Sequence, residues 1–190
     1  MKKLMILPAA FLFAGVVANA QDNSYSVAKA TIELKDARVE KKEARKELRE
    51  LQGDEVGMLV KDHFYATFGD LNPTWRRTGY FDEASFVQDG KKTIAYYDMD
   101  AELVGTTTPA DFNELPANAQ RYIEKHYKGY DIGPAMLFDD NEANSSDMLL
   151  YGSSVADEDN YFVELSKGSK TVIVQVDMEG AVSYFKELRK

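Results

Sequence analysis

Three acidic side chains, Asp98, Asp100 and Glu102, stand at alternate positions. This is the spacing of the first three ligands of a calcium loop, where carboxylate oxygens surround the ion. A related motif follows later in the chain, at residues 177–180, so the pattern Asp-Met-acid-small occurs twice. The first chemistry to consider for this chain is therefore calcium binding at two related loops.

The remaining parts of a calcium loop are missing. Leu103 stands where the glycine of the sharp turn belongs, and Pro109 replaces the bidentate glutamate. The second copy has Ala181 at the third ligand position. Each motif lies between two apolar runs, and aspartate starts chain reversals by bonding its own backbone. The sequence therefore favours two turns of antiparallel hairpins over two calcium sites.

The chain has two histidines, His63 and His126, and no cysteine. Each histidine falls on the apolar stripe of a predicted helix, which favours a hydrogen-bonded residue at the edge of a core over a metal ligand or general base. Sequence motifs of serine hydrolases, zinc peptidases and nucleotide-binding loops do not occur. We therefore expect no enzymatic activity, no catalytic residue and no cofactor.

Two acidic runs, residues 139–142 and 157–159, flank a long insert. They could gather a divalent cation if the insert folds them together. Acidic runs are more often solvated loops, so we expect no metal site.

The N-terminus has the composition of a secretory signal peptide. A basic start is followed by an apolar run over residues 4–17 and by small residues before Gln21. That apolar run is shorter than the roughly twenty residues that span a bilayer. We expect residues 1–20 to be removed before Gln21, which predicts a periplasmic or secreted protein with no membrane span.

The composition is that of a globular chain, with 44% hydrophobic and 29% charged residues. After removal of residues 1–20, 21 basic and 32 acidic residues remain, a formal charge of −11. A field of this sign repels nucleic acid and anionic membrane, so nucleic acid is not an expected partner.

Residues 21–53 form a predicted charged helical arm, rich in Ala, Leu, Glu, Lys and Arg. Its apolar stripe is thin. A solvated helix on its own domain is the favoured interpretation, and a partner helix or a self-association seam is the alternative.

Beyond the arm, the pattern helix-then-strands occurs twice. Apolar residues at helical spacing run from Val56 to Phe68, and again from Ala119 to Tyr127 after Pro116. Strand-like runs follow each helix. The predicted fold is α+β, with tandem repeats of one helix packed on an antiparallel β-sheet, preceded by a helical N-terminal arm. The repeats are expected at residues 54–112 and 113–190, and whether they share one sheet is left open.

Residues 54–190 resemble a family of exported proteins of Bacteroidetes, the PepSY-like or beta-lactamase-inhibitor-like proteins. The resemblance is carried by Trp75, "YDMDAELVGTTT" from Tyr97, "LPANAQRYIEKHYKGYDI" from Leu115 and "YFVELSKGSKTVIVQVDMEGAV" from Tyr161. It implies tandem helix-plus-sheet units with a binding or inhibitory role, and no catalytic residues. The arm and the acidic insert depart from the simplest family pattern.

If both helices cover one face of the sheet, the other face is open to a partner. Trp75, Tyr97 and Tyr184 are the predicted anchors there, because they are large and lie in strand-like runs. A one-residue slip in register would exchange the two faces, so the exposed face is not fixed by the sequence.

The expected function is a non-enzymatic extracytoplasmic binding or inhibitory module that presents its open sheet face to an unidentified protein or peptide partner. The alternative is a structural or envelope assembly component that acts through the helical arm.

Overall fold

The computed structural model describes residues 55–188, together with six positions nearer the N-terminus: Lys29, Glu40, Ala44, Glu47, Leu51 and Gly53. The chain divides into two compact units, residues 1–51 and 52–190. The signal peptide expected over residues 1–20 lies outside the described residues. So does most of the arm expected over 21–53, of which the five described residues before Gly53 are helical and exposed.

Both predicted helices of the second unit are present. Helix α2 spans Met58–Phe68 and buries Val60 and Phe64. It stops at Gly69, whose positive φ of 78° suits a residue without a side chain. Helix α3 spans Ala117–His126 behind Pro116, which fixes its first turn. No helix among the described residues combines the length and the hydropathy required to cross a membrane.

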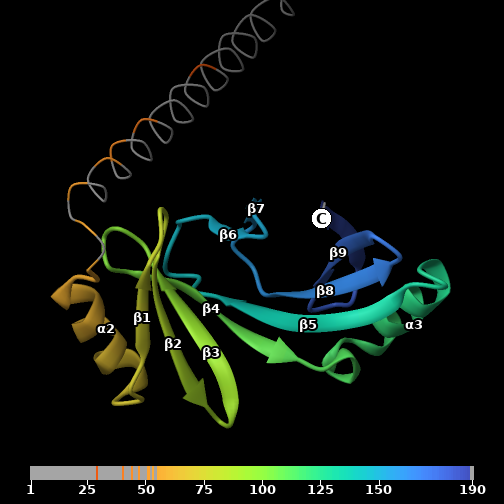
Figure 1. Ribbon diagram of the computed structural model, residues 1–190, viewed down its shortest axis with the longest axis horizontal. Coiled ribbons are helices and arrows are strands. Elements are labelled where there is room, and N and C mark those ends of the chain that lie inside the picture. Colours follow the sequence, from red (N-terminus) through yellow and green to blue (C-terminus); the bar gives the residue numbers. More distant parts are fainter. Residues whose placement is uncertain are drawn as a thin grey trace, which may run out of the picture. The chain divides into compact units, whose positions relative to one another are not determined.

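Eight of the ten described strands form one continuous antiparallel sheet, in the order β1-β2-β3-β4-β5-β8-β9-β10. Figure 1 shows β2 to β5 side by side in it. The two sets of four strands join where β4 pairs with β5, from Gly105 opposite Asp140 to Ala110 opposite Ala135. The bounds are β1 Thr74–Arg77, β2 Asp82–Gln88, β3 Lys91–Tyr97, β4 Leu103–Ala110, β5 Asp131–Asp140, β8 Asn160–Lys167, β9 Lys170–Asp177 and β10 Val182–Leu188.

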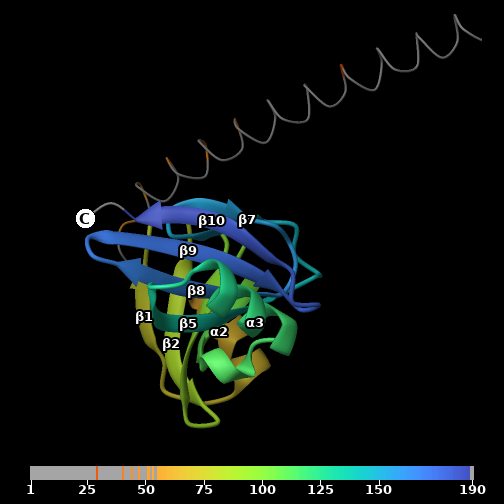
Figure 2. The same cartoon turned by 90° about the vertical axis from the view of Figure 1, so that its right-hand side faces the viewer.

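Both helices pack on the same face of the sheet. Phe64 of α2 meets Ala84, Phe86 and Tyr97 from β2 and β3. Strand alternation sends these alternate residues to one side. Ile123 of α3 is buried with Val163 and Val174 of β8 and β9 in a second cluster. Figure 2 shows α3 beside β5. Paired positions such as Val163 and Val174 lie side by side across the ladder. Each helix therefore packs on its own apolar cluster of strand residues.

The opposite face carries a third apolar cluster, which a separate hairpin covers. Strands β6 (Met148–Leu150) and β7 (Ser153–Val155) form a two-stranded sheet of their own. The hairpin side chains Met148, Leu150 and Val155 are buried against residues of the main sheet, among them Phe138, Phe162 and Ile173. The acidic insert is therefore not a pair of solvated loops along its whole length, because its middle completes a core.

The α+β prediction holds in its coarse form. The described part of the chain is a large antiparallel sheet with two α-helices, so strands predominate.

Candidate binding site

The two Asp-Met-acid-small motifs are hairpin turns, as predicted. Asp98 follows β3, and its Oδ1 atom accepts hydrogen bonds from the backbone N–H groups of Asp100 at 2.8 Å and Glu102 at 3.1 Å. In the second copy, Oδ1 of Asp177 accepts from the N–H of Ala181 at 2.7 Å. These carboxylates serve the turn itself, and the described residues contain no group of three or more His, Cys, Asp or Glu that could hold a metal ion.

Asp98 also ties the insert to the sheet. Its second oxygen, Oδ2, accepts from Oγ of Ser146 at 2.9 Å and from Nδ2 of Asn144 at 3.3 Å. The carboxylate is buried, and its two oxygens together receive four donors. It therefore joins the β3–β4 turn to the segment that leads into β6.

Each turn is held by a side chain from the helix of its own half. Nδ1 of His63 on α2 lies 2.7 Å from the carbonyl oxygen of Ala101. On α3, Nδ2 of Asn118 donates to the carbonyl oxygen of Glu179 at 2.8 Å. His126 bonds only the carbonyl of Tyr122 in its own helix. Both histidines are thus hydrogen-bonded residues of their helices. His63 bonds the β3–β4 turn, whereas His126 bonds within α3.

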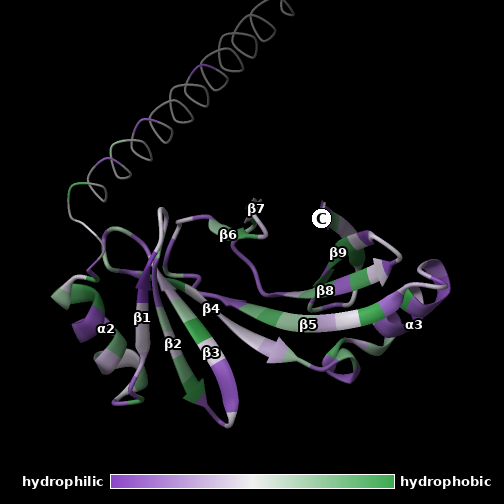
Figure 3. Ribbon diagram, viewed as in Figure 1, coloured by the Kyte–Doolittle hydropathy of each residue, from purple (hydrophilic) through white to green (hydrophobic). Residues whose placement is uncertain are grey.

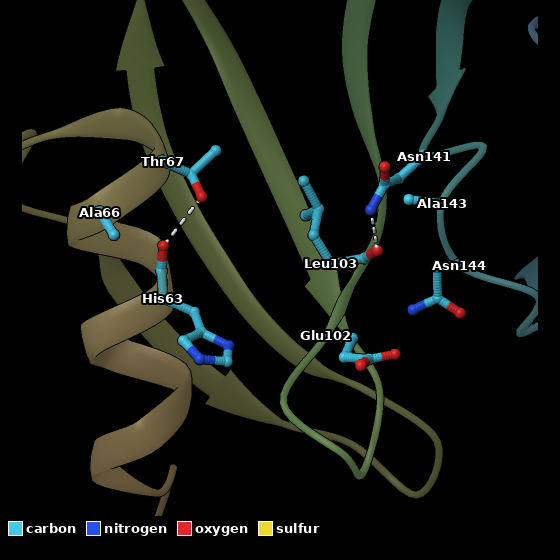
Figure 4. A pocket seen from close by; sticks show the side chains of 8 residues that line it. All are labelled: His63, Ala66, Thr67, Glu102, Leu103, Asn141, Ala143 and Asn144. Atoms are coloured by element: carbon cyan, nitrogen blue, oxygen red, sulfur yellow. Dashed lines mark hydrogen bonds between the residues drawn. The ribbon is translucent and has the colours of Figure 1, made fainter.

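A polar cleft of about 320 Å³ opens beside His63 (Figure 4). Its polar lining is largely engaged in internal hydrogen bonds. Asn141 donates from Nδ2 to the carbonyl of Leu103 at 2.6 Å, and Thr67 donates to the carbonyl of His63 at 2.9 Å. The lining comes from α2, the β3–β4 turn and the start of the insert. Its polar groups mainly hold these segments in place through internal hydrogen bonds.

The acidic runs come together at the base of the insert. The backbone N–H of Asp140 donates to Oδ1 of Asp159 at 2.9 Å. Oδ2 of Asp140 is buried without a hydrogen-bond partner. Burial, followed by repulsion from Asp157 and Asp159, raises the pKa of Asp140 to about 6. The carboxylates of Asp140, Asp157 and Asp159 therefore repel one another at the base of the insert.

None of the three predicted anchors lies on the face opposite the helices. Tyr97 is 0% exposed and belongs to the cluster under α2. Trp75 packs half-buried on the same cluster, with its ring 5.4 Å from that of Phe64 in an edge-on arrangement. The expectation that these residues are presented on the open face is wrong, because apolar strand residues fill the helix-covered side of the sheet as well.

Tyr184 is exposed, at 62%, but on the helix-bearing side. It pairs with Val174 of β9, which points into the α3 cluster. The register thus follows the alignment of Asp98 with Asp177, in which Tyr97 corresponds to Val176 and both point toward a helix. Tyr184 keeps a surface position that neither Trp75 nor Tyr97 has.

A groove of about 460 Å³ lies beside β1 and the end of β2. Leu71 and Phe86 in its lining belong to the cluster under α2, and the register places Thr74, Ser85, Val87 and Lys92 on the face opposite the helices. We call this groove the open-face groove. Alternation from the buried residues Ala84 and Phe86 places Ser85 and Val87 on this face, and Val87 is 61% exposed. Figure 3 shows the apolar end of β2 beside the polar start of β3. The lining residues are Leu71, Asn72, Thr74, Ser85, Phe86, Val87 and Lys92.

The sequence reasoning missed this groove because its members on the open face, Thr74, Ser85, Val87 and Lys92, are not aromatic. The usable signal was the pairing of "SFV" with "KKTI" across the Asp89-Gly90 turn, which sets Val87 opposite Lys92 and Ser85 opposite Ile94. Both pairs lie on the face opposite the helices, so the residues of that face can be identified once the register is known.

The chain is similar in fold to solved proteins of Bacteroides species. One is a BLIP-like protein from Bacteroides fragilis, with a TM-score of 0.57 and 16% identity over 75% of this chain and 94% of that one. A DUF2874 family protein from Bacteroides uniformis has a TM-score of 0.55 and 12% identity, over 70% and 89% of the two chains. A third, from Bacteroides eggerthii, is provisionally described as periplasmic and has a TM-score of 0.55 and 12% identity, over 70% and 88%.

No family model matches the chain, and no curated protein matches it. At these identities the similarity shows the fold alone. The fold is that of BLIP-like and DUF2874 proteins, and the structural comparisons do not extend the resemblance to PepSY proteins specifically.

Proposed function

We propose that the protein is a non-enzymatic extracytoplasmic binding module, and that the open-face groove contacts its protein or peptide partner. The main support for the proposal is that the β6–β7 hairpin covers only part of the face opposite the helices. The β6–β7 hairpin buries the cluster around Phe162 and Ile173, whereas Val87 remains 61% exposed beside a groove. Exposed apolar surface in a groove with polar rims is typical of interaction sites.

The groove has the mixed chemistry of a peptide-binding surface. Val87 offers apolar contact, Thr74 and Ser85 offer hydroxyl groups, and Lys92 offers a positive charge. A partner side chain that enters the groove would exclude water from Val87 and meet hydrogen-bonding groups at the rim. The similarity to a BLIP-like protein supports a binding role by analogy of fold.

The extracytoplasmic setting of the proposal rests on the signal-peptide pattern of residues 1–20 and on a structural neighbour provisionally described as periplasmic. We also propose that residues 54–190 form a tandem repeat, with one copy at residues 54–112 and the other at residues 113–190. Two groups of elements support it, α2 with β1 to β4 and α3 with β5 and β8 to β10. In each group a side chain of the helix bonds the turn before the last strand.

The experiment is affinity capture from an extracytoplasmic extract, quantified by mass spectrometry, with three forms of the protein. Val87→Glu places a charge in the groove, and Met178→Glu is the matched control, because Met178 is also exposed but lies in the β9–β10 turn. We expect at least one protein to be retained by the wild type and by Met178→Glu and lost from Val87→Glu. The same set of proteins on all three forms, with all three folded, would exclude the groove as the binding site.

A further inference from the structure

Four tyrosines gather on the helix-bearing side of the sheet, at the end of α3 and on β10. The rings of Tyr127 and Tyr130 meet edge to face with centroids 5.7 Å apart. Tyr127 and Tyr130 pack on the cluster under α3, and Tyr184 lies on the same side because it pairs with Val174 of that cluster. Burial, and then Tyr122, Tyr130 and Tyr184, raise the pKa of Tyr127. Tyr122 and Tyr184 are both well exposed. The four rings therefore form one patch with apolar faces and polar tips.

Two lysines border this patch. Nζ of Lys167 lies 5.5 Å from the centre of the Tyr130 ring, in a cation–π contact. Nζ of Lys170 lies 3.0 Å from Oε2 of Glu187 on β10, and both side chains are largely in solvent. The last turn of α3 adds Lys125. We call the four tyrosines with Lys167 and Lys170 the tyrosine–lysine surface, and its two lysines stand on a chain with a formal charge of −9.

The tyrosine–lysine surface borders an unpaired sheet edge. β10 is the last strand of the sheet and pairs only with β9 among the described strands. Before the irregularity between Tyr184 and Lys186, its residues from Val182 run in regular register. The other edge strand, β1, has four residues, and its Arg77 is bound to Asp82 of β2. β10 is longer and offers a row of backbone groups to another strand.

We propose that the tyrosine–lysine surface binds an extended acidic segment of another protein, which adds beside β10 as a ninth strand. Strand addition supplies backbone hydrogen bonds, and alternate side chains of the added segment meet the surface next to the edge. Tyr184 gives rigid apolar area at that edge, and Lys167 and Lys170 attract carboxylates. A second copy of this chain is a poorer occupant, because it would bring the same lysines and its own net charge of −9.

The test is a titration followed by the backbone amide signals of the full folded chain in NMR. One probe is a blocked peptide of about nine residues, a common strand length, that alternates glutamate with valine. The second probe replaces every glutamate with lysine. We expect the acidic probe to shift the signals of Val182 to Leu188 and of the residues around Tyr127, and the lysine probe to shift them far less.

Substitutions separate the contributions of the ring and the charge. Tyr184→Ala should weaken binding of the acidic probe by about fivefold or more, as loss of an anchor does. The control Tyr80→Ala should not, since Tyr80 is exposed at the other end of the sheet. Lys167→Glu with Lys170→Glu should reverse the preference toward the lysine probe, whereas Lys61→Glu on α2 should leave it unchanged.

Several results would overturn the proposal. They are no shift at saturating acidic probe, equal shifts with both probes, or equal loss in Tyr80→Ala and Tyr184→Ala. A concentration-dependent dimer that protects the β10 amides without peptide would make a second copy the occupant. Shifts confined to Ser85, Val87 and Lys92 would point to the open-face groove instead, so the two binding surfaces can fail independently.

Discussion

Nδ1 of His63 and the carbonyl oxygen of Ala101 lie 2.7 Å apart and join helix α2 to the turn between β3 and β4. Ala101 has a positive φ of 64°, which is uncommon for a residue with a side chain. The corresponding bond in the second half runs from Asn118 to Glu179, beside Gly180 with a φ of 85°. A helix side chain thus holds each repeated turn, although the two side chains differ in chemistry and in helical position.

We expect His63→Ala to lower the free energy of unfolding by about 1 kcal/mol, because the Ala101 carbonyl loses its partner. Asn118→Ala should act similarly on the second turn. His126→Ala is the control, since its bond stays within α3 and is exposed, and it should change stability by less than about 0.5 kcal/mol. Urea unfolding of the three variants measures this. Equal losses of stability in His63→Ala and His126→Ala would contradict a role for His63 in holding the β3–β4 turn.

Asp98→Ala should release the insert from the sheet as well as weaken the turn. A buried carboxylate with four donors leaves all of them unpaired when it is removed, which costs about 2 to 4 kcal/mol. Hydrogen exchange should become faster at the amides of β6. Asp177→Ala, which loses one turn bond and no bond to the insert, should leave β6 exchange unchanged. Unaltered β6 exchange in Asp98→Ala would show that the hairpin is held by its apolar side chains alone.

Ile123→Asp should unfold the second half of the sheet. Ile123 is buried between α3 and the strands, and an unpaired charge there costs more than about 3 kcal/mol. The control is Ile132→Asp, at an exposed position on β5, with an expected loss below about 1 kcal/mol. Far-UV circular dichroism on heating distinguishes them. A melting curve of Ile123→Asp like that of the wild type would mean that α3 does not pack there.

The pKa of Asp140, raised to about 6 in the folded chain, predicts a dependence of stability on pH. In the unfolded chain an aspartate titrates near 3.9, so the folded state binds this proton more tightly. The stabilising contribution is fully present below about pH 3.9 and is lost as the pH rises through about 6. The wild type should therefore gain stability from this group between pH 7 and pH 5.

The variant Asp140→Asn isolates this contribution. At pH 7 it should be more stable than the wild type by about 1 kcal/mol, a value reduced for solvent screening, and the difference should shrink toward pH 5. Asp131→Asn on the exposed start of β5 is the matched control. A constant difference between Asp140→Asn and wild type across this range would contradict the raised pKa.

The elements of the fold could be predicted because their signals are local. The stripes that end at Gly69 and near Gly129, and the turns that begin at Asp98 and Asp177, depend on side chains close to one another in the chain. The faces of the strands could not be predicted, since strands with both sides covered alternate between two apolar surfaces. Trp75 and Tyr97 were misplaced for this reason.

The covering hairpin was the second obstacle. "MLLYG" predicts a strand, but nothing within it tells whether that strand joins the main sheet or lies across it. The outcome depends on Asp98 reaching Asn144 and Ser146, and on Lys186 donating from Nζ to the carbonyl of Tyr151 at 2.6 Å. These contacts join distant parts of the chain. The open-face groove is what the hairpin leaves uncovered, so it depended on the same long-range contacts.

The order of strands in the sheet is their order in the chain, apart from the hairpin set aside between β5 and β8. Every ladder therefore closes between strands that are successive within the main sheet, which keeps the entropy of loop closure small and favours rapid folding. No strand has to be inserted between two that are already paired, so the sheet can grow from either end without threading. A chain cut short within its last strand would lose β10 and leave β9 as the new edge, with the seven preceding strands still able to pair.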